Sequence, residues 1–283
     1  MKVIRRRTAL KKYLQGFKRK RESVGFVPTM GYLHEGHLSL VRRARRENDH
    51  VVVSIFVNPL QFGPKEDLTS YPRDAKRDLR LLKKEKTDVV YLPDEKSFYP
   101  PDFETRVSVP KLSRPLCGTS RPIHFTGVAT VVLKLLNQVS PDVLYLGQKD
   151  HQQCRVVERM VEDLDVPVEV RIGPTLREKD GLAMSSRNVR LDAQERMQAA
   201  FLHKAFAEAE SLVRRGVRSA EKLRSVMRKT LSAATRAKID YAEIVDAATL
   251  EPVIQLKAGQ KIELALAVFF SKARLIDNRV IRV

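Results

Sequence analysis

The sequence predicts an α/β protein with a Rossmann-like, doubly wound parallel sheet and a second, smaller α+β domain. Up to Pro174, short and almost continuously apolar segments alternate with amphipathic ones, as in parallel strands that are covered by helices on both faces. After Pro174 the order changes, because two helical segments are followed by three strand-like segments. We therefore predict a first domain over residues 1–175 and a second over residues 176–283.

The first domain is expected to repeat a strand-then-helix unit. Each predicted strand is a short apolar run, and each predicted helix carries apolar residues at helical spacing. The predicted strands cover residues 24–28, 51–58, 88–92, 143–146 and 166–172, and the predicted helices cover residues 36–48, 72–86, 127–139 and 149–164.

The second domain is expected to be built from consecutive helices and then consecutive strands. Helices are predicted over residues 194–215 and 220–234. Strands joined by tight turns are predicted over residues 239–246, 261–270 and 274–283. Ligands often bind in the cleft beside such a change of domain, so the hinge near Pro174 is a place to look for function.

The composition is that of a globular protein. With 283 residues, of which 43% are hydrophobic and 31% charged, the chain can bury about three quarters of its extended surface. The longest apolar runs, residues 51–57 and 264–270, are far shorter than the ~20 residues of a membrane span, and the basic N-terminus leads into no apolar signal core. We expect no membrane partner and a cytoplasmic location. Cys117 and Cys154 are expected to be reduced thiols.

The charge is strongly positive. Lys and Arg number 53 against 34 Asp and Glu, a formal net charge of +19, which attracts nucleotides, nucleic acids and acidic metabolites alike. The basic residues are scattered, however, and a chain with no Trp and 6% aromatic residues offers little surface for stacking bases. Nucleic acid is therefore not the expected partner.

A pair of histidines follows the first predicted strand. The segment Pro28–His37 places His34 and His37 three residues apart at the start of a helix, and Gly36 between them lets a phosphate approach the backbone N–H groups. A metal-binding pair or two surface histidines are the alternatives. The H-E-x-x-H, Walker and G-x-G-x-x-G patterns are absent, which removes the usual support for a zinc protease, a kinase or a dehydrogenase.

Polar residues also follow two other predicted strands. In Asn58–Phe62, amide side chains can donate hydrogen bonds to a carboxylate or hydroxyl without adding charge, although a plain turn is the alternative. In Gly147–Gln153, Lys149 can neutralise phosphate and Asp150 can accept from a ribose hydroxyl, although a solvated helix start is the alternative. Parallel sheets bind ligands at this edge.

The fourth candidate lies just beyond the hinge, at Met184–Arg187. Two hydroxyls and one guanidinium form a clamp that suits phosphate oxygens during phosphoryl or nucleotidyl transfer, and a serine-rich loop is the alternative. Each of the four segments follows a strand or the hinge. This shared placement argues against coincidence.

These segments, in this order, closely resemble the pantothenate synthetase (pantoate–β-alanine ligase) family. His34–His37 is also similar to the H-x-G-H signature of the nucleotidylyltransferases and aminoacyl-tRNA synthetases, and Met184–Arg187 is similar to a shortened K-M-S-K-S loop. The resemblance extends over Pro28–His37, Asn58–Phe62, Tyr71–Arg73, His124–Gly127, Gly147–Gln153, Met184–Asn188 and Arg274–Asn278.

The resemblance implies an ATP-dependent ligase. ATP would be a co-substrate, with Mg²⁺, and the small-molecule substrates would be pantoate and β-alanine. Pantoate would first form pantoyl adenylate with release of pyrophosphate, and β-alanine would then displace AMP to give pantothenate. It further implies a homodimer and a lid formed by the smaller domain.

The resemblance also implies roles for individual residues. The catalytic set would be His34, His37, Lys149, Ser185, Ser186 and Arg187, with His37 as the acid. Pantoate would be held by Gln61 and Gln153, with Asn58 nearby. ATP would be contacted by Pro28, Met30, Gly31, His34, Gly36, His37, Gly147, Gln148, Lys149, Asp150, Leu176, Met184, Ser185, Ser186 and Arg187.

The magnesium site is the least typical part of the pattern. The family often carries adjacent acidic residues here, whereas Arg77 precedes Asp78 in this chain. Asp78 is the candidate metal contact, and ATP oxygens and water are expected to hold most of the ion.

Two further functions remain as alternatives. A related nucleotidyltransferase would release pyrophosphate without ligation. An RNA-binding protein would use the same core and its positive charge, although little more than 100 residues follow the hinge, which leaves no room for an appended anticodon-binding domain.

Overall fold

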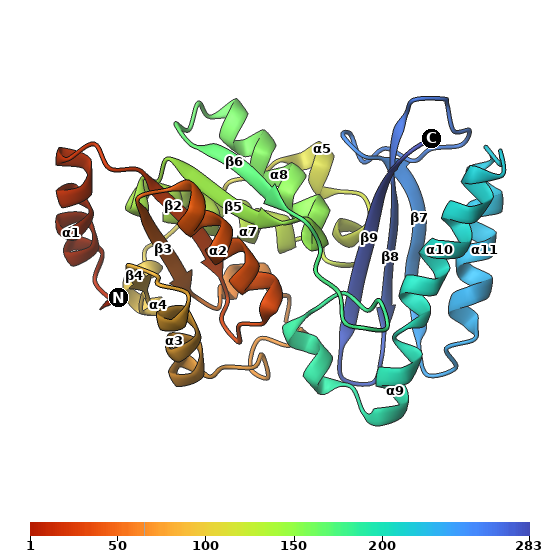
Figure 1. The fold of residues 1–283 in the computed structure, drawn as a ribbon, viewed down its shortest axis with the longest axis horizontal. Coiled ribbons are helices and arrows are strands. Elements are labelled where there is room, and N and C mark those ends of the chain that lie inside the picture. The colour runs from red at the N-terminus through yellow and green to blue at the C-terminus, as the bar shows by residue number, and fades with distance from the viewer. Residues whose placement is uncertain (65) are drawn as a thin grey trace. The chain divides into compact units, whose positions relative to one another are not determined.

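Residues 1–64 and 66–283 are described by the computed structural model of this chain (Figure 1). By their internal contacts they form two compact units. The first unit comprises Met1–Ser113, Ile123–Gln148 and Gln153–Pro174, and the second comprises Arg114–Pro122, Lys149–Gln152 and Thr175–Val283. Arg114–Pro122 and Lys149–Gln152 therefore belong to the second unit although they precede Pro174. A single boundary in the sequence does not describe this division.

A six-stranded, fully parallel sheet forms the centre of the first unit. The strand order is β1-β4-β3-β2-β5-β6. The central strands are almost entirely buried because their residues are nearly all apolar. The strands are β1 (Lys2–Ile4), β2 (Val24–Thr29), β3 (His50–Ile55), β4 (Val89–Tyr91), β5 (Val143–Gly147) and β6 (Glu169–Gly173).

Helices connect these strands and cover both faces of the sheet (Figure 1). From β2 the chain steps through β3 to β4 in one direction, whereas β5 and β6 extend the sheet in the other, so right-handed connections place their helices on opposite faces. The direction reverses between β2 and β5, the position where such sheets bind ligands. The longer helices are α1 (Arg7–Arg19), α2 (Glu35–Glu47), α3 (Ala75–Lys84), α7 (His124–Val139) and α8 (His151–Asp163).

Short helical turns fill several connections. Three of them, α4 (Glu95–Phe98), α5 (Pro110–Ser113) and α6 (Cys117–Ser120), lie in the long connection between β4 and β5. The 3₁₀ turns are η1 (Pro59–Gln61), η2 (Gln148–Asp150) and η3 (Ser186–Arg190).

The second unit contains a three-stranded antiparallel sheet with the order β7-β8-β9. Helices α10 and α11 lie side by side along it in Figure 1, and their apolar faces share one core with the strands. The strands are β7 (Lys238–Asp246), β8 (Lys261–Phe269) and β9 (Arg274–Arg282), and the helices are α9 (Ala193–Gln198), α10 (Phe201–Arg214) and α11 (Ala220–Ser232).

The predicted fold class is confirmed, with differences in individual elements. The strand β1 and the helix α1 were not predicted, because β1 is only three residues long and basic residues interrupt the apolar positions of α1. The helix predicted over residues 194–215 is two helices. Ala199 and Ala200 keep helical dihedral angles, but Leu202 N–H donates to Ala199 O in a tighter turn, which periodicity does not reveal.

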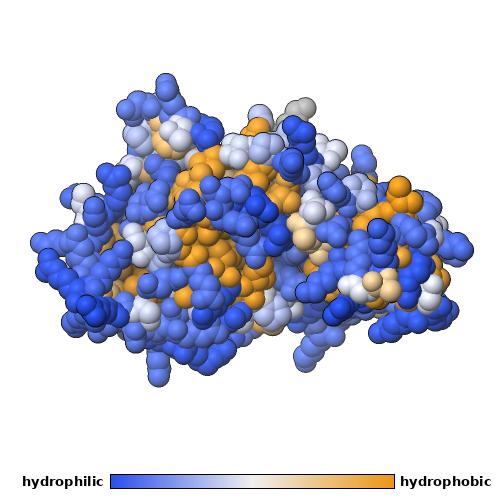
Figure 2. Space-filling model, turned by 90° about the horizontal axis from the view of Figure 1, so that it is seen from above, coloured by the Kyte–Doolittle hydropathy of each residue, from blue (hydrophilic) through white to orange (hydrophobic). Residues whose placement is uncertain are grey.

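Hydrophilic side chains cover most of the face seen in Figure 2, with apolar residues visible between them. None of the helices in the described part of the chain has the length and apolar character that crossing a bilayer requires.

Candidate active site

The turn between β2 and α2 has an unusual backbone. Gly31 has φ +86° and Tyr32 has φ +51°, both in the left-handed region. A Cβ on Gly31 would also lie 2.9 Å from Cγ2 of Ile55 and 3.1 Å from Oδ2 of Asp78. Glycine is therefore needed at this position for its conformation and for space.

Asp78 anchors this turn from α3. Its Oδ2 accepts from Tyr32 N–H at 2.8 Å and its Oδ1 accepts from Leu33 N–H at 2.8 Å, and the residue is only 1% exposed. Burial raises the pKa of the Asp78 carboxyl above its usual value, and the two backbone hydrogen bonds oppose that rise. Arg77 closes the same turn by donating to Leu33 O at 2.8 Å. This carboxylate therefore fixes the entry into α2.

His34 and His37 form the N-terminal cap of α2. His34 Nδ1 accepts from Gly36 N–H at 3.2 Å, and His34 N–H donates to His37 Nδ1 at 3.4 Å, so the ring centroids lie 4.1 Å apart. Because each Nδ1 accepts a backbone hydrogen, the neutral rings carry their protons on Nε2. The helix start thus combines two Nε2–H donors with the positive end of a 13-residue helix, which suits an anion.

Asn58 orients Gln61 at the end of β3. Its Nδ2 donates to Gln61 Oε1 and to Gly127 O, both at 3.0 Å, while its Oδ1 accepts from Tyr99 OH at 2.9 Å and from Leu60 N–H at 3.3 Å. Asn58 is 1% exposed and these contacts occupy both hydrogens of its amide. Asn58 therefore serves as the support that fixes which way the Gln61 amide faces.

Helix α7 packs very closely against η1, which carries Gln61. A Cβ on Gly127 would lie 2.2 Å from Leu60 O, and His124 Nδ1 lies 2.9 Å from Gln61 O. The residues of the His124–Gly127 motif thus place the two amide side chains against the end of β3.

In the second unit, two segments that carry candidate nucleotide residues are attached to β9. Lys149 O accepts from Asn278 Nδ2 at 2.8 Å, and Lys149 Nζ lies 3.4 Å from Asp150 Oδ1. Arg177 forms a bidentate ion pair with Asp277, with NH1 to Oδ2 at 2.6 Å and NH2 to Oδ1 at 3.1 Å.

The residues around the Met184–Arg187 motif form a short hairpin. Arg177 pairs with Ala183, and Met184 N–H donates to Leu176 O at 2.9 Å, which brings two candidate ATP contacts together. Ser185 then caps η3, because its Oγ accepts from Arg187 N–H at 3.2 Å.

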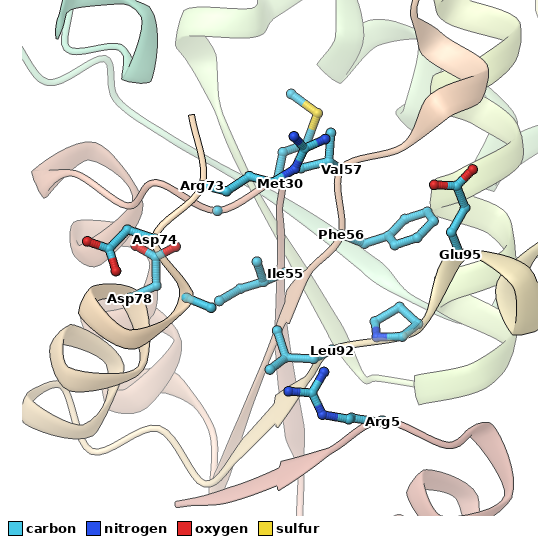
Figure 3. Close-up of a pocket in the computed structure, with 13 residues that line it drawn as sticks. Arg5, Met30, Ile55, Phe56, Val57, Arg73, Asp74, Asp78, Leu92 and Glu95 are labelled. Carbon is cyan, nitrogen blue, oxygen red and sulfur yellow. The ribbon is translucent and has the colours of Figure 1, made fainter. Parts of the chain in front are cut away.

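A pocket adjoins the β2–α2 turn in the first unit (Figure 3). Ile55, Phe56 and Leu92 form its apolar part, with Asp74 and Asp78 on one side and Glu95 on the other. Of the candidate site residues, Met30, Gly31 and Asp78 line this pocket.

The chain matches the family model described as Pantoate-beta-alanine ligase over residues 2–280. The chain belongs to this family. Pantothenate synthetase from Thermotoga neapolitana is 56% identical over 281 residues, which covers 99% of this chain and 100% of that protein. The crystal structure of pantothenate synthetase from Thermus thermophilus has a TM-score of 0.92 and 46% identity, with 99% of each chain covered.

A pantoate-beta-alanine ligase from Francisella tularensis has been solved in complex with Beta-gamma ATP and Beta-alanine. Its TM-score is 0.81 and its identity 33%, with 99% of this chain and 97% of that chain covered. Membership of the ligase family confirms the resemblance that the motifs indicated. The roles of individual residues remain predictions.

Asp78 is the one residue for which a magnesium contact was predicted from the sequence. No group of three His, Cys, Asp or Glu suited to a metal occurs among residues 1–64 and 66–283. Both Asp78 oxygens accept backbone hydrogens, as the geometry of the turn requires. Asp78 thus holds the turn with both of its oxygens, and the metal contact predicted for it stays a prediction.

Sequence reasoning missed the supporting residues of the ligase site. Tyr99, Arg177, Asp277 and Asn278 each hold a candidate residue or its segment. Asp277 and Asn278 belong to a motif that carried the resemblance, but the motif held no sign of what they contact. Pro28, on β2, and Gly147, at the end of β5, lie on neighbouring strands of the sheet, and Gln148 follows directly.

Proposed function

We propose that this chain condenses pantoate with β-alanine in an ATP-dependent reaction that passes through pantoyl adenylate. The observation that carries the proposal is the pair His34 and His37 at the N-terminus of α2, whose Nδ1 atoms accept backbone hydrogens, beside the switch point of the sheet. Family membership and the Francisella relative's complex with Beta-gamma ATP and Beta-alanine support it.

The first step makes the acid reactive. A carboxylate oxygen of pantoate attacks the α-phosphorus of ATP, and the bond from that phosphorus to the bridging oxygen breaks as pyrophosphate leaves. Negative charge then grows on the departing phosphates. His34, His37 and the first N–H groups of α2 stabilise that charge, and His37 can donate its Nε2 proton.

The second step forms the amide. The β-alanine amine attacks the acyl carbon of the mixed anhydride, AMP leaves with the electron pair of the broken C–O bond, and the amine loses a proton. Alignment of the reactants supplies most of the acceleration. Water must be kept from the anhydride, and we assign that task to residues 176–283 as a lid.

We assign pantoate to Gln61 and Gln153, with Asn58 fixing the Gln61 amide so that its Nε2 donates. Lys149, Ser185, Ser186 and Arg187 contact the phosphates and Asp150 the ribose in this proposal. Met30, Gly31, Leu176 and Met184 pack against the nucleotide.

Mg²⁺ enters this proposal as part of the MgATP substrate, held by phosphate oxygens and water. We further propose that the enzyme is a homodimer and acts in the cytoplasm. Sedimentation of the purified chain would show one species of twice the 32.3 kDa monomer mass.

A coupled AMP assay with each reactant omitted in turn tests the reaction. AMP formation is expected only when ATP, pantoate and β-alanine are all present. Pyrophosphate release that continues steadily without β-alanine would instead identify a nucleotidyltransferase. Tight, salt-dependent RNA binding with no pyrophosphate release would identify an RNA-binding protein.

The His37→Ala variant tests the central assignment. Losing one preorganised donor to the transition-state charge is expected to lower kcat at least ~100-fold while the fold is retained. His50→Gln is the matched control, because His50 pairs with Glu22 at the opposite end of the sheet. Normal turnover by His37→Ala would rule out the assigned role.

A further inference from the structure

Two adjacent side chains on β9 hold the two segments that carry the candidate phosphate contacts of the second unit. Consecutive residues of a strand face opposite sides of a sheet. Asp277 and Asn278 therefore reach two segments that lie far apart in the sequence, residues 176–187 and residues 149–152. Neither residue is a candidate for contact with ATP.

Asp277 holds the hairpin that precedes η3. Its side chain is fully buried, and its two oxygens accept from NH1 and NH2 of Arg177. Arg177 NH1 also donates to Gly181 O at 3.0 Å across the hairpin turn. Gly181 has φ +87°, and a Cβ there would lie 2.3 Å from His203, so this turn has little room to shift. The hairpin ends at Met184, directly before Ser185.

Asn278 holds the segment that carries Lys149 and Asp150. Its Nδ2 donates to Lys149 O at 2.8 Å. Two residues further on, His151 Nδ1 lies 2.9 Å from Glu263 Oε2 on β8, with both side chains buried. Asn278 is registered opposite Ala265, so its side chain and that of Glu263 point to the same face. That face therefore contacts the segment at two points.

The two attachments are themselves joined. Asn278 N–H donates to Asp277 Oδ1 at 2.8 Å, the same oxygen that accepts from Arg177 NH2. Arg177 NH2 also donates to Asn278 O at 3.4 Å. A shift of either side chain thus disturbs the geometry of the other.

We propose that Asp277 and Asn278 are positioning residues for ATP: they set the places of Lys149 and of the Ser185–Arg187 clamp from opposite faces of one strand. This inference rests on the proposed function, in which those residues contact the triphosphate. Loss of either attachment lets a phosphate contact move, and small displacements of such groups are costly to binding and to rate.

The test compares Asp277→Asn and Asn278→Ala with the wild-type enzyme. Both variants are expected to raise the KM for ATP, and the Kd for ATP measured by calorimetry, by about tenfold or more, with the KM for pantoate unchanged. Glu210→Gln is the matched control. It removes another ion pair between β9 and the rest of the second unit, Arg279 NH1 to Glu210 Oε2 at 2.8 Å, without touching either segment.

A double-variant cycle separates positioning from general stability. Arg177→Met combined with Asp277→Asn is expected to raise the ATP KM no further than the more severe single variant, because both substitutions remove the same ion pair. Lowered Tm with unchanged ATP parameters in Asp277→Asn and Asn278→Ala would overturn the inference. If Asp277→Asn does not fold, Arg177→Lys replaces it beside Asn278→Ala. A raised KM and Kd for ATP would then support positioning, and a lowered Tm with unchanged ATP parameters would overturn it.

Failure of the proposed function has a different signature. It would show as a wild-type chain that forms no AMP from pantoate and β-alanine. ATP calorimetry on the same variants does not depend on turnover. A wild-type chain that binds ATP, with binding unaffected by Asp277→Asn and Asn278→Ala, would overturn the positioning role alone.

Discussion

Asp78 is a buried carboxylate that holds a backbone turn in place. Burial raises the pKa of its carboxyl, so the surroundings taken together disfavour the ionised form. Yet both oxygens accept backbone hydrogens of the Tyr32–Leu33 turn, directly before the histidine cap of α2. The residue therefore directs the backbone that presents His34 and His37.

Asp78→Asn tests this role against metal binding. The amide keeps one acceptor but turns an NH₂ toward the other backbone N–H, so the turn should shift and kcat should fall by about tenfold or more. The Mg²⁺ concentration for half-maximal activity is expected to stay the same. Asp74→Asn is the control, because Asn caps α3 as well as Asp does. A raised Mg²⁺ requirement in Asp78→Asn would instead make Asp78 a metal contact.

Among the elements, η1 and α7 show that packing sets the place of the candidate pantoate residues. The absence of a side chain at Gly127 lets α7 approach the backbone of Leu60, and Asn58 then links both elements to Gln61. A larger residue at this point would displace the turn that carries the amides.

Gly127→Ala and Gly16→Ala form a matched pair. A Cβ at Gly127 would meet backbone atoms, so we expect a loss of about 1–3 kcal/mol in unfolding free energy and a higher KM for pantoate. A Cβ at Gly16 in α1 would meet nothing within 4 Å, so we expect a gain of about 0.5–1 kcal/mol and normal kinetics. Denaturant unfolding and steady-state assays measure both, and equal effects would contradict the packing argument.

The C-terminal end of α2 is connected to the sheet by ion pairs and hydrogen bonds of Glu47. Hydrogen bonds from Arg43, and then from Arg171 and Tyr145, lower the pKa of Glu47 to about 2. A lowered carboxyl pKa adds stability that is complete above the usual value of 4.5 and is lost as the pH falls toward 2.

Glu47→Gln should therefore lower Tm at pH 7 relative to the wild type. The difference in Tm is expected to shrink as the pH falls below about 4.5. Calorimetry from pH 7 downward measures it, and a difference that grows on acidification would contradict the assignment.

At the scale of the whole molecule, the charge of +19 acts on every anion that approaches. Attraction of this kind weakens as salt screens it. We expect kcat/KM for ATP to fall as KCl is raised from low to high concentration. The value for β-alanine, which has no net charge, should change little. Equal salt dependence for both substrates would argue against long-range attraction.

The alternation of apolar and amphipathic segments was enough to predict the fold class, since parallel strands buried on both faces must be apolar throughout. The histidine pair and the amide and hydroxyl motifs were likewise visible, because each lies in a few consecutive residues. The pairing of Asp78 with Tyr32, of Asn58 with Gly127, and of Asp277 with Arg177 joins residues 46, 69 and 100 positions apart. Such contacts arise only when the chain is packed, because nothing in the local sequence specifies which distant groups will meet.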